Sequence, residues 1–176
     1  QRKGLAMWAG MDYMIMLIAG AKLDPTNDNK RRLGELVARQ REGGTTTQLP
    51  YFMCEHAMAC ASLDRFAESI EHLDEALRIA ESSGERRHVA EILRRRASVK
   101  ASDRADRSEV VADLVEAVNV ACDQSACTYG ARAIVDLARS GDADALESIA
   151  GPALAMLDGA HSGAVAGIIG EANRML

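Results

Sequence analysis

The sequence predicts an all-α fold, a right-handed superhelix built from antiparallel helix pairs, with eight or nine helices in all. Three observations lead to this prediction. Apolar residues recur at spacings of three and four along nearly the whole chain, whereas no segment alternates as a half-buried strand does. The chain contains only three prolines and is rich in good helix formers. A helical pattern also recurs at intervals of 35–41 residues, which is typical of a helical solenoid.

Composition narrows the classes of function. The 176 residues are 48% hydrophobic, enough for one domain with a proper core. Aromatic residues make up 3% of the chain, which argues against a surface that reads bases or sugars on stacked rings. The net charge of −5 argues against a general nucleic-acid-binding face. The four cysteines show no disulfide spacing, so we expect them reduced and the protein cytoplasmic.

Residues 5–20 form the most apolar stretch and predict the first helix. They follow Arg2-Lys3 as in a signal peptide, but Asp12 interrupts the run and no good cleavage site follows. The stretch is too short to span a bilayer. We therefore expect a buried helix and no membrane partner.

This first helix is apolar almost all round, although a solenoid normally ends in a polar cap. We therefore expect it to be covered, either by a second copy in a homodimer or by preceding repeats of a longer chain. Methionine suits such contacts because its side chain is adaptable. Four methionines lie in this helix: Met7, Met11, Met14 and Met16.

The next three helices follow from capping and breaking residues. Asn29 or Asp28 is expected to cap a helix that ends near Arg41. The run 43–47, Gly-Gly-Thr-Thr-Thr, is the clearest break in the chain. Pro50 suits the first turn of a helix over 51–62. Asp64 is expected to start a fourth helix that ends at the Ser-Ser-Gly run of 82–84.

The second half of the chain predicts four or five more helices. A fifth is expected over 85–101, and Ser108 is expected to cap a sixth. A seventh is expected over 125–139, and an eighth from 142 or 143 to 157. Pro152 is awkward inside that eighth helix, because proline removes a backbone hydrogen bond. A ninth helix is expected over 164–176.

The even-numbered helices can be overlaid on one another. DRFAESIEHLDEAL (64–77) matches SEVVADLVEAV (108–118) when Ala76 is set on Ala117. Ala57 and Ala133 occupy equivalent small positions about nineteen residues earlier, and small residues let paired helices approach closely. All four alanines are expected to be buried. The predicted organisation is a single domain with repeats at 5–42, 50–83, 85–124 and 125–158, and a terminal helix at 163–176.

The run ALRIAESSGERRHVAEILRRRASV (76–99) resembles the tetratricopeptide-repeat (TPR)-like C-terminal region of bacterial signalling ATPases. These are cyclase–ATPase fusions and LuxR/STAND-type transcription activators. SACTYGARAIVDLARSG (125–141) and MLDGAHSGAVAGIIGEANRML (156–176) are similar to later parts of that region. The resemblance implies a non-catalytic protein–protein interaction module of a larger bacterial signalling or transcription-regulating protein. Its partners would be a protein or peptide segment and the other domains of the parent chain, which would carry any ATPase or cyclase activity.

Motifs for chemistry are sparse. The sequence contains no GxSxG elbow and no GxxxxGK[ST] loop, so we expect no catalytic residue and no cofactor. His56 and Cys60 are four residues apart on one helix face, which offers half a zinc site. A closed site needs two further ligands, so His72 or the Cys122/Cys127 pair would have to converge on them. Buried cysteine acting as a small hydrophobe is commoner, and we expect no metal.

The predicted fifth helix is unusually basic in an acidic chain, with Arg86, Arg87, His88 and the arginines of 94–96. These charges either dock an acidic segment or phosphate, or pair with acidic residues of neighbouring helices. In TPR arrays the first helix of each pair lines the concave groove. This rule predicts nine partner-groove residues: Tyr13, Met16, Tyr51, Cys54, Met58, Arg87, Glu91, Arg94 and Ser98. The alternative is a small-ligand- or metal-binding helical domain that uses the Cys/His or Arg cluster.

Overall fold

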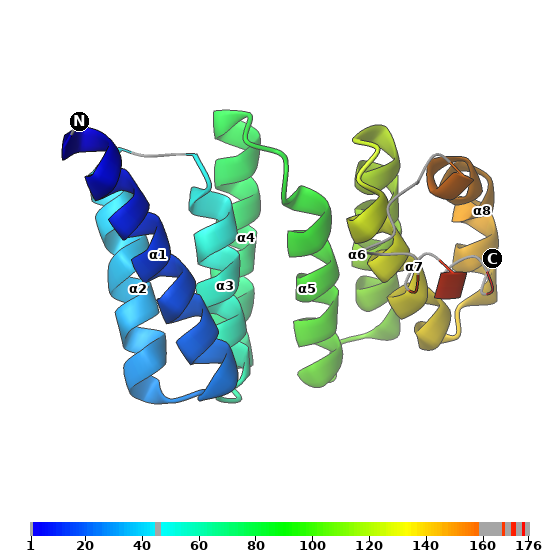
Figure 1. Ribbon diagram of the computed structural model, residues 1–176. Coiled ribbons are helices and arrows are strands. Elements are labelled where there is room, and N and C mark those ends of the chain that lie inside the picture. The colour runs from blue at the N-terminus through cyan, green and yellow to red at the C-terminus, as the bar shows by residue number, and fades with distance from the viewer. Residues whose placement is uncertain (1, 45–46, 159–166, 168–169, 172–173, 175–176) are drawn as a thin grey trace. The chain divides into compact units, whose positions relative to one another are not determined.

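A computed structural model of the chain describes residues 2–44, 47–158, 167, 170–171 and 174. For residues 2–12 and 158 it describes the backbone alone. The described residues form eight α-helices and contain no strand, which confirms the all-α prediction (Figure 1). The chain divides into two compact units, Gln1–Glu85 and Arg86–Leu176.

Unit 1 contains four helices, which lie side by side in Figure 1. Helix α1 packs on α2 and α3, α2 packs on α3, and α3 packs on α4. The helices are α1 (Arg2–Leu23), α2 (Asn27–Glu42), α3 (Leu49–Ala61) and α4 (Phe66–Ser83). Their bounds match the predicted elements to within a few residues, because the apolar spacing that predicts each helix also fixes its buried face.

The third helix forms the centre of unit 1. Its sequence, LPYFMCEHAMACA, is apolar around almost the whole circumference, so it is covered on several sides. Pro50 lies in its first turn as predicted. The buried carboxylate of Glu55 is met by Nζ of Lys22 from α1 at 2.9 Å. Helices α1, α2 and α4 all pack against α3.

Two helix starts in unit 1 differ from prediction. Thr26, rather than Asn29 or Asp28, caps α2: its backbone is extended, and its hydroxyl accepts from the Asn29 backbone N–H at 3.2 Å. Asn29 instead donates through its side chain to the Asp24 carbonyl at 2.8 Å. Asp64 lies in the turn before α4, with φ of 58°, and the helix begins two residues later.

Unit 2 contains the other four helices. Helix α5 packs on α6 and α7, α6 packs on α7 and α8, and α7 packs on α8. The helices are α5 (Val89–Ser102), α6 (Arg107–Asp123), α7 (Cys127–Ser140) and α8 (Ala143–Asp158). Pro152 lies inside α8 with its side chain exposed, and the helix continues past it.

Two starts in unit 2 also differ from prediction. Helix α5 begins at Val89, so Arg86, Arg87 and His88 precede it rather than lying on it. The Val89 N–H closes a turn on the Arg86 carbonyl at 3.1 Å before the first helical bond is made. Helix α6 begins at Arg107, with Asp106 rather than Ser108 at the cap position.

The expected burial of the four small residues is confirmed. Ala57, Ala76, Ala117 and Ala133 are each 0% exposed. The predicted helix over 164–176 falls largely outside the described residues, as do the side chains of Met7 and Met11. None of the helices is long and apolar enough, over the residues described, to cross a membrane.

Candidate functional site

The basic residues of α5 are held by buried carboxylates inside unit 2. Glu91 is 4% exposed, and Arg94 donates to its two oxygens through Nε and Nη2 at 2.9 Å each. Arg95 donates to the same carboxylate at 2.8 Å, and Nη1 of Arg132 lies 3.9 Å from it. One carboxylate therefore organises three guanidinium groups.

The same cluster ties α5 to α7. Arg94 donates through Nη1 to Asp136 at 2.6 Å, so this guanidinium bridges two carboxylates. Burial raises the pKa of Glu91, but hydrogen bonds and charge from Arg94 and Arg95 outweigh it and lower the pKa overall. Burial likewise lowers the pKa of Arg94, and Glu91 and Asp136 reverse this and raise it. Both groups are therefore held in their charged forms.

A second group of ion pairs connects α5 to α6. Arg96 donates to Asp113 on α6 through Nε at 3.0 Å and Nη2 at 2.7 Å, in the bidentate geometry that favours arginine. Nζ of Lys100 lies 3.0 Å from the same carboxylate, which is almost fully buried. Of the two interpretations of the basic stretch, pairing with acidic neighbours therefore accounts for positions 94–96.

An open groove of about 410 Å³ lies against α5, α6 and α7 within unit 2. This size falls in the ordinary range of small-ligand sites. Its apolar lining comes from Ala97, Ala101, Val110 and Leu114. Its polar lining comes from Arg94, Ser98, Ser102, Asp136, Arg139 and Ser140. The Arg139 side chain is 62% exposed and contacts Asp136 at 3.6 Å.

The structure places the nine predicted groove residues in different settings. Arg94 and Ser98 line the groove of unit 2, while Arg87 is exposed before α5. Tyr13 and Met16 are exposed on α1, and Tyr51 and Met58 are half-buried on α3.

The other two, Cys54 and Glu91, are buried. Cys54 lies in the core of unit 1, and the Glu91 carboxylate is held by arginines. Sequence reasoning missed α6 because the rule considered the first helix of each pair alone, and it named no residue of α7, although α7 is the first helix of its pair.

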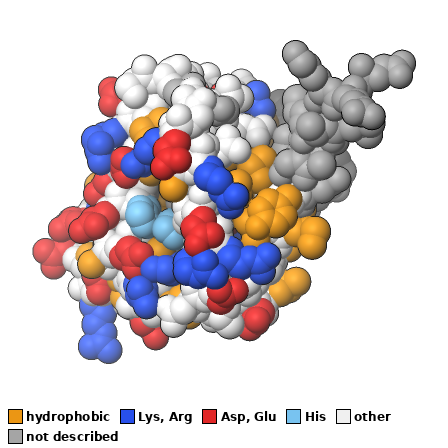
Figure 2. Space-filling model, turned by 90° about the vertical axis from the view of Figure 1, so that its left-hand side faces the viewer, with side chains coloured by type: hydrophobic (Ala, Val, Ile, Leu, Met, Phe, Trp, Pro, Cys, Tyr) orange, Lys and Arg blue, Asp and Glu red, His pale blue; other side chains and the backbone are white. Residues whose placement is uncertain are grey.

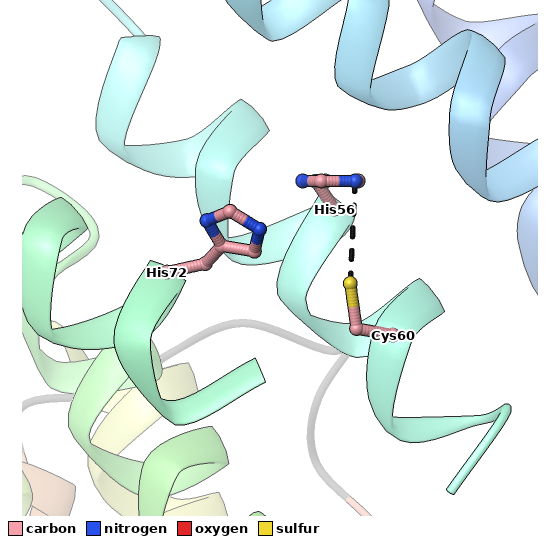
Figure 3. Close-up of side chains that lie close together, drawn as sticks. All are labelled: His56, Cys60 and His72. Carbon is pink, nitrogen blue, oxygen red and sulfur yellow. Dashed lines mark hydrogen bonds between the residues drawn. The ribbon is translucent and has the colours of Figure 1, made fainter. Parts of the chain in front are cut away.

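A second cluster lies in unit 1 and joins α3 to α4 (Figure 3). His56, Cys60 and His72 each offer one ligand atom, and these atoms all lie within 4.8 Å of one another. Nε2 of His56 is 4.0 Å from Sγ of Cys60, and the two imidazole centroids are 4.6 Å apart. His72, which the sequence left as one possible further ligand, therefore does converge on the other two.

The geometry of a helical hairpin explains this convergence. His56 and His72 lie eight residues before and after Asp64, at the turn, and Cys60 and Glu68 lie four before and after it. In an antiparallel helix pair, positions equally far from the turn face one another. The equal spacing of these residues about the turn is visible in the sequence and could have predicted the cluster.

Burial sets the protonation of the cluster. It lowers the pKa of His56 to about 4, with help from the charges of His72 and Lys30. Burial also raises the pKa of the Cys60 thiol to about 12, and the Glu68 carboxylate adds to this rise. At neutral pH His56 is therefore a neutral imidazole and Cys60 a thiol, which makes Cys60 a poor nucleophile.

Comparison of the chain with protein-family models, curated proteins and solved structures finds no match. The resemblance to TPR-like regions of bacterial signalling ATPases therefore stays a prediction. Function must be argued from the groove of unit 2 and the His/Cys cluster of unit 1.

Proposed function

We propose that the chain is a non-catalytic protein–protein interaction module, and that the groove of unit 2 binds a peptide segment that carries an apolar side chain beside a carboxylate. The observation that carries this proposal is the groove itself, open to solvent and lined by both apolar and charged side chains. The wider setting, a larger bacterial signalling or transcription-regulating protein, rests on the sequence resemblance alone.

The lining supports an apolar anchor. Ala97 and Ala101 present small side chains on α5, and Val110 and Leu114 form an apolar wall on α6. A buried apolar side chain at the centre of an interface supplies much of its binding energy. The small residues leave the room that such an anchor needs.

The charged residues at the edge of the groove support an acidic residue next to the apolar residue in the peptide. Arg94 is committed to Glu91 and Asp136, so its charge is largely neutralised. Arg139 is more exposed, and its contacts with Asp136 and Glu171 are surface ion pairs of little energetic value. A ligand carboxylate can therefore take the place of those partners on Arg139, whose planar group holds carboxylates bidentately.

The test is selection of binding peptides from a random phage-displayed library on the full chain. Ser98→Trp fills the groove from an exposed lining position, and Ala112→Trp places the same ring at an exposed position of α6 outside the lining. We expect selected peptides to pair an apolar residue with Asp or Glu. We expect Ser98→Trp to weaken them at least about tenfold, as loss of a buried anchor does, and Ala112→Trp to leave them unchanged.

Arg139→Gln tests separately whether the groove binds a carboxylate of the peptide. It should weaken the selected peptides and reduce the salt dependence of binding, because exposed charge pairs are screened by salt. Peptides that bind wild type, Ser98→Trp and Ala112→Trp equally would show that the groove is not the binding site. Failure to select any peptide that Ser98→Trp weakens would overturn the proposal.

A further inference from the structure

The His/Cys cluster of unit 1 gathers three metal-binding side chains without a strong hydrogen bond among them. The contact between His56 and Cys60 is 4.0 Å, longer than an ordinary hydrogen bond, and thiols are weak partners (Figure 3). Cys60 is 0% exposed and His56 is 9% exposed. The Glu68 carboxylate is a further hydrogen-bond partner of the Cys60 thiol, so what favours a ligand here is the convergence of the three ligand atoms.

The separations suit a small cation. Ligand atoms around a tetrahedral zinc ion are roughly 3.3–3.7 Å apart, given bonds of about 2.0–2.3 Å to nitrogen and sulfur. The three ligand atoms here lie within 4.8 Å of one another. Side-chain rotations that move each atom by about 1 Å would bring all three within bonding distance of one ion. They come from two adjacent turns of α3 and the facing turn of α4, whose backbones are fixed by the core of unit 1.

Helix α2 approaches the cluster closely at Gly34. Gly34 on α2 has no side chain, and a Cβ there would lie 2.9 Å from Nε2 of His56. Glycine in a helix interior normally costs stability, so its presence here admits the imidazole. The imidazole of His56 therefore occupies the space beside α2 that a side chain at position 34 would take.

The charged groups beside the cluster are one carboxylate, Glu68, and two cations, Lys30 and Arg65, that pair with it. Lys30 is the opposing group, but its Nζ lies 2.6 Å from Oε1 of Glu68, which offsets its charge. The same carboxylate oxygen is 4.0 Å from Nε2 of His72. Arg65 also contacts Glu68, at 3.4 Å. Glu68 thus supplies a carboxylate next to the imidazole, as is common beside metal-binding histidines.

We propose that His56, Cys60 and His72 bind one Zn²⁺ ion, with a water molecule as the fourth ligand and Glu68 as the adjacent carboxylate. Thiolate and imidazole together match the preference of zinc, whereas oxygen-rich sites match calcium and magnesium. As the S–Zn bond forms, the Cys60 thiol gives up its proton to solvent. The ion clamps α3 to α4, and so stabilises the helix pair on which unit 1 is built.

The ion has a path into the cluster. The His72 side chain is 30% exposed, so one of the three ligands reaches solvent while the other two lie behind it. Histidine atoms are visible between acidic and basic side chains on the face drawn in Figure 2. His72 is therefore the solvent-facing ligand of the cluster.

The experiment uses the full chain, reduced and freed of metal by a chelator. Titration with Zn²⁺ alone in a calorimeter should show one ion per chain, and an enthalpy that depends on the buffer because a proton is released. Titration with Co²⁺ alone should give a thiolate-to-cobalt charge-transfer band and the intense visible absorption of four-coordinate cobalt. Zn²⁺ should also raise the melting temperature, because it binds the native state.

Matched variants locate the site. Cys60→Ala and His72→Gln should each weaken Zn²⁺ binding by more than about tenfold, since even an outer-shell change has effects of that order. Cys60→Ala should also abolish the thiolate–cobalt band. Cys122→Ala and His88→Gln change the same residue types in unit 2 and should leave both signals intact. His72 is partly exposed, so His72→Gln tests the site even if Cys60→Ala does not fold.

Two results would overturn the proposal. One is the absence of stoichiometric Zn²⁺ binding to the reduced wild-type chain. The other is Zn²⁺ binding that survives His72→Gln unchanged or that Cys122→Ala removes, since the metal would then lie elsewhere. Because the peptide groove lies in unit 2, neither result bears on the proposed function.

Discussion

Gly34 on α2 and His56 on α3 approach so closely that a Cβ on the glycine would lie 2.9 Å from Nε2 of the imidazole. This is shorter than real Cβ contacts allow, so one of the two groups would have to shift. The contact shows that the glycine has a packing role in α2, and it links that helix directly to the His/Cys cluster.

The first prediction is that Gly34→Ala fails to stabilise α2. Alanine in place of a helix-interior glycine normally adds about 1 kcal/mol of stability. Here the added methyl group displaces a buried imidazole, and overpacking costs about 1–3 kcal/mol. We expect the free energy of unfolding in urea to fall, and Zn²⁺ binding to weaken with it.

Gly20→Ala is the matched control. A Cβ at Gly20 would meet only the Asn29 side chain, at 3.8 Å, which is ordinary van der Waals contact. This variant should gain the usual helix stabilisation and leave metal binding unchanged. If Gly34→Ala is as stabilising as Gly20→Ala, the close approach to His56 imposes no packing constraint.

The second prediction tests the repeat register. Ala76 is 0% exposed on α4, so Ala76→Phe forces a ring into a filled contact and should cost about 1–3 kcal/mol. Ala67 is exposed on the same helix, and Ala67→Phe should change stability by less than about 0.5 kcal/mol. The melting temperatures of the two variants measure the difference. Equal melting temperatures would contradict the predicted register.

The sequence predicts the helices well because each one buries a face whose spacing is visible in the residues. The four small alanines are buried as their register predicts. Exact starts are harder to predict, because several polar residues compete to cap a helix. Thr26 is the cap of α2 because its backbone is extended, whereas Asp28 and Asn29, which are equally good capping residues, lie inside the helix.

The site residues are less predictable, because they depend on which helices meet. Glu91 carries a charge, which suggests exposure, yet it is buried by the three arginines that surround it. Arg139 and Val110 enter the groove only through the packing of α6 and α7 against α5. His72 could have been placed beside His56 from the sequence, because the two residues are equally far from Asp64 at the turn. That step requires the assumption that the two helices form an antiparallel hairpin.

The third prediction concerns the pH dependence of stability. The pKa of Glu91 is lowered in the folded chain from its usual value of 4.5. A depressed pKa favours the charged form, so its contribution is complete above 4.5 and is lost as pH falls through the folded pKa. At neutral pH Glu91→Gln should cost about 1–3 kcal/mol, the range for a buried bond to a charged group.

This cost should shrink as pH falls from 4.5 through the lowered pKa of folded Glu91, because the wild-type carboxylate then becomes neutral as well. Urea unfolding at a series of pH values measures the trend. Glu116→Gln, an exposed change on α6, is the control and should show little effect at any pH. A cost of Glu91→Gln that stays constant down to the lowest pH would mean that the carboxylate is not stabilised by its arginines.

The last prediction separates the two arginines that the sequence placed together in a partner groove. Arg94 bridges Glu91 and Asp136, whereas Arg87 lies exposed before α5. Breaking a buried ion pair from one side costs about 3–5 kcal/mol, because the opposite charge stays buried. We therefore expect a large loss of stability for Arg94→Ala, and a change within about 0.5 kcal/mol for Arg87→Ala.

A double-mutant cycle of Arg94→Ala with Asp136→Asn gives the link between α5 and α7 directly. Residues in one ion-pair network couple by about 0.5–3 kcal/mol, whereas independent sites add. Strong coupling, with peptide binding unaffected by Arg87→Ala, would make Arg94 a structural residue of the groove wall and leave Arg139 as the charge that meets the ligand. Additive effects on stability, with Arg94→Ala weakening peptides in a folded chain, would instead return Arg94 to the partner site.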